Sequence, residues 1–111
     1  MADKAIPPVV NLGSVNAVPL GQGRCFVVGG ESIAIFRQRD GRIFASHNQC
    51  PHSKGPLSEG IVGNGNVICP LHGHQFSLES GAGSVASECL QVFPVQEVDG
   101  NIVMNLESVS V

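Results

Sequence analysis

Short hydrophobic runs alternate with glycine-containing turns along most of the chain. The segments RCFVV at 24–28 and SIAIFR at 32–37 are rich in β-branched and aromatic residues, and Gly29-Gly30-Glu31 separates them. This pattern predicts a β-hairpin. The next turn, at Asp40-Gly41, leads into RIFAS at 42–46. Three consecutive antiparallel strands with short connections are therefore predicted.

The rest of the chain repeats this pattern. Further strands are predicted at residues 9–12, 61–62, 66–69, 75–78, 91–95 and 102–106, with turns at Gly63-Asn64-Gly65, Glu79-Ser80-Gly81 and Asp99-Gly100. One segment after Ser14 has the pattern of a single helical turn, with Ser14 as its N-cap and Pro19 and Gly21 as its end. Many short strands and closely spaced turns indicate an all-β fold, an antiparallel β-sandwich or small barrel.

The hydrophobic residues of these strands are the candidates for the core. They are Ile33, Ile35, Phe36, Ile43, Phe44, Phe76, Val92, Val95 and Val103. A chain of 111 residues, 42% hydrophobic and 14% charged, is long enough for one core and too short for two. We therefore expect a single domain over residues 1–111.

Charge and hydropathy restrict the expected partners. The net charge is −3 and no basic run is present, which argues against a nucleic-acid partner. No apolar run exceeds four residues, and the N-terminal segment has no pattern of a secretory signal. We therefore expect a cytoplasmic protein with no membrane span.

The chain has four cysteines. In a reducing compartment, thiols serve metal binding or catalysis more often than disulfides. Cys25, in the strand-like RCFVV, is expected to be a small buried side chain, and Cys89 is given the same structural role. The other two cysteines belong to a motif.

That motif is CPHSKGPLSEGIVGNGNVICPLH, which opens with Cys50 and His52 and closes with Cys69 and His72. In extended or turning backbone, residues i and i+2 can point the same way, so Cys50 and His52 can reach one metal centre from one loop. Cys69 and His72 can do the same from a second loop. The four side chains are therefore the candidate metal ligands.

The donor set leaves more than one metal open. Two thiolates and two imidazoles suit a tetrahedral zinc, although zinc sites usually place both Cys in one knuckle and both His in another. Here each loop supplies one Cys and one His, which is what a dinuclear centre needs if one iron takes both thiolates and the other both imidazoles. A structural zinc module stays the alternative. A Cys–His nucleophile is disfavoured, since nothing marks an orienting group or an oxyanion hole.

The spacing Cys-x-His, sixteen residues, then Cys-x-x-His resembles the signature of Rieske iron–sulfur proteins, and the likeness extends from about residue 20 onward. The resemblance implies a Rieske-type β-fold with a cluster-binding subdomain of two loops, at about residues 47–58 and 68–78. It implies a [2Fe–2S] cluster whose inner iron is bound by Cys50 and Cys69 and whose outer iron is bound by His52 and His72. With all four ligands supplied by the protein, the chain is expected to transfer single electrons and to have no catalytic site of its own.

The sequence departs from the high-potential members of that family. Those members have a further Cys in each loop, joined as a disulfide, and a Ser and a Tyr whose hydroxyls bond to sulfur. The corresponding positions here are Gly55, Leu71, His74 and Phe76. Fewer hydrogen bonds to sulfur disfavour the reduced state, so we expect a potential near the lower end of the Rieske range, about −150 mV.

Two groups within the family have free-standing chains of about this length. The loop CPHSKGPLSEGIV and the segment GQGRCFVVGGESIAIFRQRDG favour the small subunit of NAD(P)H-dependent nitrite reductase. Its partner would be a large flavin and sirohaem subunit that reduces nitrite to ammonium in nitrate assimilation. The alternative is the ferredoxin component of an aromatic ring-hydroxylating dioxygenase, which would exchange electrons with a ferredoxin reductase and a terminal oxygenase. No small-molecule substrate is expected, and His47 and His74 are expected to be loop residues without a ligand role.

Overall fold

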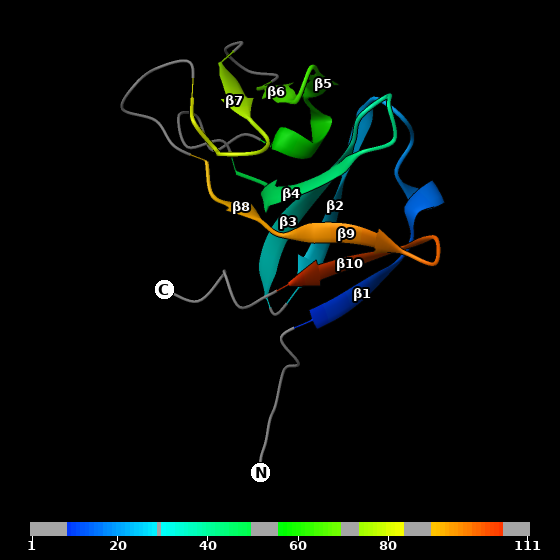
Figure 1. Ribbon diagram of the computed structural model, residues 1–111. Helices are drawn as coiled ribbons and strands as arrows, with labels where there is room; N and C mark the ends of the chain where they lie inside the picture. Colours follow the sequence, from blue (N-terminus) through cyan, green and yellow to red (C-terminus); the bar gives the residue numbers. More distant parts are fainter. Residues whose placement is uncertain (1–8, 29, 50–55, 70–73, 84–89, 106–111) are drawn as a thin grey trace.

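The structure, a computed structural model, describes residues 9–28, 30–49, 56–69, 74–83 and 90–105. These residues form three antiparallel sheets and two short 3-10 turns, with no α-helix among them (Figure 1). The predicted all-β, antiparallel fold is confirmed. Within the same ranges, no helix has the length and apolar character needed to cross a membrane.

The central sheet has four strands in the order β2-β3-β4-β8, and three-stranded sheets lie on either side of it (Figure 1). Its strands are β2 (Gln22–Val28), β3 (Glu31–Arg37), β4 (Ile43–His47) and β8 (Val92–Phe93). The second sheet, in the order β1-β10-β9, contains β1 (Val9–Ser14), β10 (Asn101–Asn105) and β9 (Val95–Val98). The third sheet contains β5 (Ile61–Gly63), β6 (Asn66–Ile68) and β7 (Gln75–Ser77), and the 3-10 turns are η1 (Val15–Ala17) and η2 (Leu57–Glu59).

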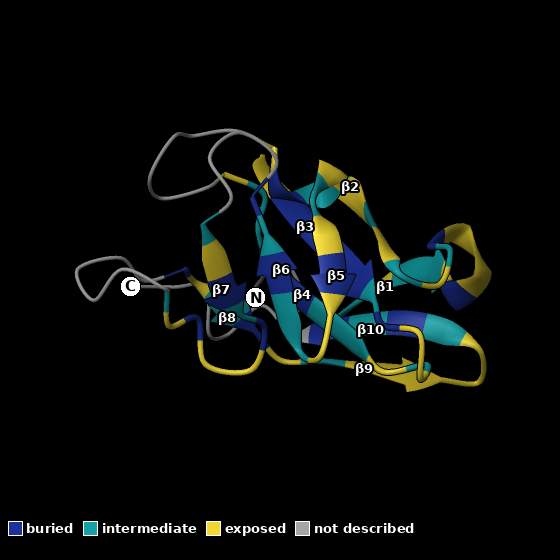
Figure 2. Cartoon of the chain, turned by 90° about the horizontal axis from the view of Figure 1, so that it is seen from above, coloured by how far each residue is buried: buried dark blue, intermediate teal, exposed yellow. Residues whose placement is uncertain are grey.

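Strand β3 is covered on both faces. Ile33 and Ile35 point to one side and Ala34 and Phe36 to the other, and all four are at most 1% exposed. A continuous apolar run is the pattern of a strand buried on two faces, whereas a strand with one wet face alternates. Figure 2 shows β3 largely in the dark blue of buried residues. β3 therefore separates the two cores of the molecule.

One core lies between β3 and the third sheet, and the other lies between β3 and the second sheet. The loop-side core contains Ala34, Phe36, Leu57, Val62, Val67, Cys69, Phe76, Leu78 and Leu90. The sheet-side core contains Val15, Val18, Val28, Ile33, Ile35, Ala45, Phe93, Ile102 and Met104. The loop-side core joins the third sheet and η2 to the central sheet, so it positions the segments that carry the motif.

Two of the predicted turns have the backbone that tight hairpins require. Asn64 and Gly65 have φ of 52° and 77°, and Asp99 and Gly100 have φ of 53° and 80°. Positive φ at both central residues is the geometry of a type I′ turn, for which Asn-Gly and Asp-Gly are the preferred sequences. These turns connect β5 to β6 and β9 to β10. At both places the sequence alone predicted the turn correctly.

The predicted strand at 91–95 is wrong as one element. The structure divides it into β8, which pairs with β4, and β9, which pairs with β10. Pro94 lies between them and has no N–H to donate to a ladder, so the chain changes sheets there. β9 then continues to Val98, three residues beyond the prediction.

The predicted core is confirmed for Ile33, Ile35, Phe36 and Phe76. Four others, Ile43, Phe44, Val92 and Val95, are partly buried and pack against one of the two cores. The prediction that Val103 belongs to the core is wrong. Side chains alternate along a strand, and Ile102 and Met104 are the buried residues of β10. The helical turn after Ser14 is confirmed as η1, where Ser14 Oγ accepts a hydrogen bond from the Asn16 N–H at 3.1 Å.

Gly81 lies in close contact with the backbone of Leu90, a residue of the loop-side core. Its φ is +85°, and an added Cβ would overlap the carbonyl oxygen of Leu90. We expect Gly81→Ala to lower the free energy of unfolding by about 3 kcal/mol, from backbone strain and the forced shift of Leu90. Gly63→Ala is the control, because no atom lies within 4 Å of the added Cβ, and its change should stay within about 0.5 kcal/mol. Urea denaturation measures both, and equal effects would contradict the prediction.

Candidate metal centre

Cys69 is the one candidate ligand that lies within the described residues. It follows β6 directly and its side chain is buried in the loop-side core, 1% exposed. Its backbone N–H donates to the carbonyl of His74 at 2.7 Å. This bond extends the β6–β7 ladder by one step, so residues 70–73 connect two positions that are held together by hydrogen bonding.

The register of this ladder places Cys69 on a defined face. Val67 pairs with Phe76 and Ile68 with Gln75, so Cys69 lies opposite His74. Because side chains alternate along a strand, Cys69 shares its face with Val67 and, on the partner strand, with Phe76. Cys69, Val67 and Phe76 are at most 1% exposed. The face that carries Cys69 is the one that packs on β3.

The first loop of the motif begins and ends at an equally well-held position. Gln49 and Pro56 form an isolated antiparallel bridge on either side of residues 50–55. Asn48 anchors this bridge: its N–H donates to the Ser32 carbonyl at 3.0 Å, and its own carbonyl accepts from the Leu57 N–H at 2.7 Å. Its Oδ1 accepts from the Ser58 N–H at 2.8 Å. One asparagine therefore ties both ends of the first loop to β3.

Described residues next to each loop lie in one core. Leu57, immediately after the bridge, is fully buried in the loop-side core that also contains Cys69. Cys50, His52 and His72 lie outside the described residues. Within the described ranges, no group of three or more His, Cys, Asp or Glu side chains is placed to hold a metal. The four candidate ligands belong to two segments, and the described residues Leu57 and Cys69, one from each segment, lie in the same core. This arrangement fits a cluster shared between the segments.

The other titratable residues of the sequence analysis have different surroundings. His47 is not in a loop but ends β4, where its ring lies 5.4 Å from the Phe93 ring and its Nε2 lies 3.9 Å from Glu31 Oε1. His74 begins the approach to β7 and is half-buried. Cys89 lies outside the described residues.

The prediction that Cys25 is buried is wrong. Its side chain is exposed, and its sulfur lies 3.0 Å from the Ser32 hydroxyl oxygen. Cys25 pairs with Ala34 and so points to the loop-side face, but β2 is the edge strand of its sheet. Burial there depends on how far η2 and the third sheet reach across, which local sequence does not reveal.

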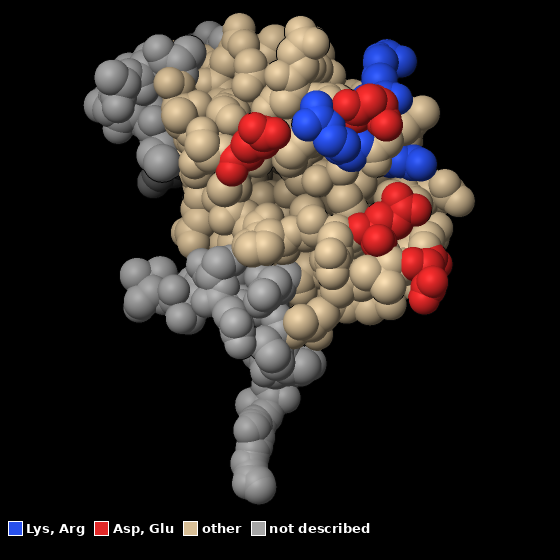
Figure 3. All heavy atoms as spheres, viewed as in Figure 1, with Lys and Arg blue, Asp and Glu red and all other residues tan. Residues whose placement is uncertain are grey.

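Several charged side chains lie near the turn that joins β3 to β4. Arg42 Nε lies 2.9 Å from Asp40 Oδ2, and Arg42 Nη1 lies 3.6 Å from Glu79 Oε2. The hydrogen bond from the Arg42 backbone N–H, followed by bonds from the Arg42 and Gln38 side chains, holds the pKa of Asp40 below its usual value. On the face shown in Figure 3, the blue and red side chains gather mostly on one side. The Arg42 side chain thus links Asp40, in the β3–β4 turn, to Glu79, which follows β7.

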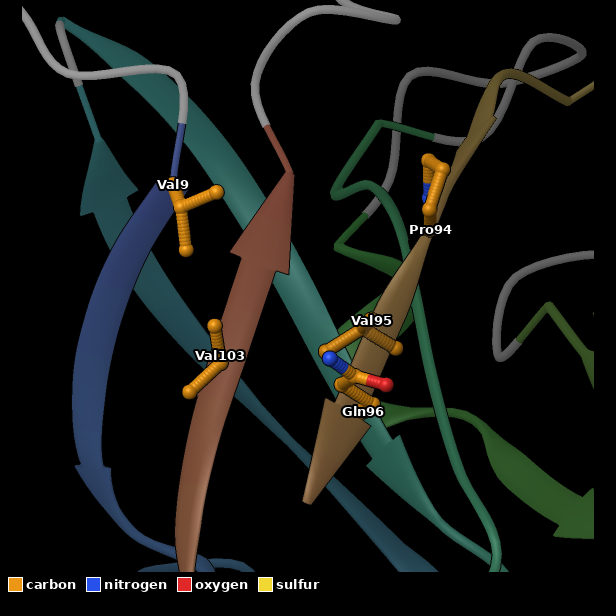
Figure 4. Close-up of a pocket in the computed structure, with 5 residues that line it drawn as sticks. All are labelled: Val9, Pro94, Val95, Gln96 and Val103. Carbon is orange, nitrogen blue, oxygen red and sulfur yellow. The ribbon is translucent and has the colours of Figure 1, made fainter. Parts of the chain in front are cut away.

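A shallow hollow of about 290 Å³ lies on the outer face of the second sheet, lined by Val9, Pro94, Val95, Gln96 and Val103 (Figure 4). The described residues that line it include no titratable side chain.

Comparison with known proteins decides between the zinc site and the iron–sulfur cluster. The model of the Rieske [2Fe–2S] domain matches residues 9–96. The chain belongs to the Rieske [2Fe–2S] domain family. The zinc-module alternative is accordingly not supported, and the chain is an electron-transfer protein that binds a [2Fe–2S] cluster.

Three relatives of this Rieske protein cover most of its length. The ferredoxin subunit of anthranilate 1,2-dioxygenase from Burkholderia cepacia is 36% identical over 97 residues, which is 86% of this chain and 89% of the relative. A solved structure described as the small subunit of an NADPH nitrite reductase has a TM-score of 0.79 at 29% identity, covering 86% of this chain and 96% of its own. A structure described as the small subunit of an NADH-dependent nitrite reductase from Mycobacterium tuberculosis has a TM-score of 0.81 at 25% identity, covering 90% and 96%. Both groups named in the sequence analysis are therefore represented.

Proposed function

We propose that Cys50 and Cys69 hold the inner iron and His52 and His72 the outer iron of the cluster, and that the chain passes single electrons between two larger redox proteins. The observation that supports the ligand set is the shared anchoring of the two loops. Residues 50–55 start and end at the Gln49–Pro56 bridge, while Cys69 is buried in the same core as Leu57. When bound, the cluster supplies a one-electron couple; the protein supplies four ligands, and no coordination position is left for a substrate.

The burial of Cys69 agrees with its place in this ligand set. A thiolate in an apolar core is costly unless a metal takes up its charge, so a cysteine there is either a protonated core residue or an inner ligand. Cys69 stands at the end of β6, where the ladder gives way to residues 70–73 and His72. A buried Cys69 followed by His72 in the next segment fits a thiolate ligand of the inner iron and an imidazole ligand of the outer iron.

The sequence analysis favoured a nitrite reductase small subunit, but the identities of the relatives lead us to favour the ferredoxin component of an oxygenase. The dioxygenase ferredoxin subunit has the higher identity of the relatives compared above, and it is a free-standing chain of nearly the same length. In this role the chain would accept electrons from a reductase and deliver them to a terminal oxygenase. Its docking would be transient, because an electron carrier must bind two partners in turn through a small interface.

The small subunit of a nitrite reductase is the second candidate. It is favoured by the two structural relatives described in that way, each of which this chain covers almost completely. In this role the chain would stay with a large flavin and sirohaem subunit.

Electron delivery separates the two candidates. The cluster is reduced photochemically and mixed in a stopped-flow spectrometer with a ring-hydroxylating oxygenase component or with a sirohaem nitrite reductase large subunit. We expect rapid reoxidation by the oxygenase and slow reoxidation by the sirohaem subunit, with the Cys69→Ala protein as the control that carries no electron. Rapid transfer to the sirohaem subunit alone would favour the second candidate, and transfer to neither would contradict both.

A further inference from the structure

Strand β2 has an edge to which no described strand pairs. β2 is the outer strand of the order β2-β3-β4-β8, and Figure 2 shows it at the margin of the molecule. It is seven residues long. An unpaired strand edge of this length is a template for another strand, since its N–H and C=O groups point outward in a regular row.

The hydrogen bonds of β3 show which residues of β2 face outward. The Asn48 N–H donates to the Ser32 carbonyl and the Gln38 N–H to the Arg42 carbonyl, so the even-numbered residues of β3 face β4. The odd-numbered residues of β3 therefore face β2, and through the register they meet the even-numbered residues of β2. Cys25 and Val27 are left with their N–H and C=O groups directed away from the sheet.

Between Arg24 and Val28 this edge has little protection. Proteins usually blunt such edges with charged side chains, proline, a bulge or a very short strand, and in this segment only Arg24 is of that kind. The edge strand β1 has a register shift between Asn11 and Gly13, and β9 follows Pro94. By contrast, Arg24–Val28 pairs with β3 in regular register, and Val27 is 76% exposed, the most exposed large hydrophobic residue among those described.

We propose that β2 pairs antiparallel with β2 of a second copy of this chain, around a two-fold axis through Phe26. The two four-stranded sheets would then form one continuous sheet. η2 reaches β2 at Gly23, where the Ser58 carbonyl occupies the place of a side chain, so the pairing begins beyond it, at Arg24. This proposal does not depend on the choice of redox partner.

The segment is complementary to itself in this register. Cys25 lies opposite Val27 of the second copy, which brings two exposed side chains together on the loop-side face. Phe26, half-buried against the sheet-side core, lies opposite its own symmetry mate as a cross-strand aromatic pair. Because of the two-fold symmetry, each contact between the two copies occurs twice in the dimer.

The charges agree with a second copy as the occupant. Arg24 lies opposite Val28 of the other chain, and Val28 pairs within its own sheet with Glu31. Arg24 and Glu31 are both exposed and would lie in the same cross-strand row, about 10 Å apart at the backbone, which these two long side chains span. The dimer therefore contains two such Arg–Glu pairs and no like charges in opposition.

The oligomeric state of the cluster-loaded protein tests the proposal. We expect a concentration-dependent dimer in sedimentation velocity, weak because five paired residues bury less area than a standard interface. Val27→Lys should weaken dimerisation about tenfold, since each dimer contains two such positions. Val98→Lys is the matched control: Val98 is also an exposed valine, on β9 at 41% exposure, and its substitution should leave the dimer unchanged.

Charge reversal separates this register from other pairings. Arg24→Glu should weaken the dimer, and the double variant Arg24→Glu/Glu31→Arg should restore it. Hydrogen exchange of a peptide covering residues 24–28 should slow as protein concentration rises, with the visible cluster absorbance confirming that each variant is folded. A monomer at every concentration, a dimer unaffected by Val27→Lys, or a dimer lost equally with Val98→Lys would overturn the proposal.

Discussion

The Cys69→Ala variant is expected to purify without its cluster. Cys69 is buried at the end of β6. In the proposed ligand set, removal of its thiolate leaves an iron without one of its protein ligands. Iron and acid-labile sulfide, two of each in a [2Fe–2S] cluster, should both fall to near zero. The visible absorbance bands and the electron paramagnetic resonance signal of the reduced cluster should disappear with them.

Two other cysteines provide the controls for this result. Cys25→Ala should keep full iron and sulfide, because Cys25 is exposed on β2 and bonds to Ser32. Cys89→Ala should do the same, whereas Cys50→Ala, His52→Ala and His72→Ala should resemble Cys69→Ala.

Loss of core packing must be separated from loss of the ligand. The Cys69→Ala substitution also removes a buried sulfur atom, at a cost of about 1 kcal/mol. Comparison with the metal-free wild-type protein by urea denaturation isolates that part. A Cys69→Ala protein that retains its cluster would contradict the ligand assignment, and a colourless wild-type protein with one bound zinc would contradict the cluster itself.

The sequence predicted those features of the molecule that depend on neighbouring residues. The Asn64-Gly65 and Asp99-Gly100 turns were predicted because the need for positive φ at two consecutive residues is met by only a few residue types. β3 was predicted as a strand from its β-branched and aromatic residues, whereas the burial of both its faces became apparent only in the structure. The candidate ligands were identified in the same way, from residue type and spacing alone.

Features that depend on distant residues were not predicted. Asn48 anchors the first loop, yet its role requires Ser32 and Ser58 to be adjacent in space, and these lie 16 and 10 residues away in the chain. The exposure of Cys25 depends on the extent of the third sheet. The change of sheets at Pro94 depends on which strand is available as a partner on either side. No local pattern encodes these relations.

The reduction potential is expected to lie near the lower end of the Rieske range, about −150 mV. The resemblance to the family places a hydroxyl donor to sulfur at the position of Phe76 in high-potential members. Phe76 is fully buried and lies on the same face of the β6–β7 ladder as Cys69, one step away along the diagonal. A phenyl ring there cannot donate a hydrogen bond to sulfur, so the reduced state gains no stabilisation from one. Protein-film voltammetry measures the potential, and a midpoint above roughly +100 mV would contradict the prediction.

Phe76→Tyr tests the cause of the low potential. If the added hydroxyl donates to the Cys69 sulfur, and if that bond strengthens by about 1 kcal/mol on reduction, the one-electron midpoint should rise by about 40 mV. Phe76→Leu is the control, because it alters the packing of the same core without adding a donor, and its midpoint should stay close to that of the wild type. The two variants differ in hydrogen bonding to sulfur, so a rise in both would assign the potential to packing or solvent access. A rise in Phe76→Tyr alone would assign it to the missing donor on the strand that faces Cys69.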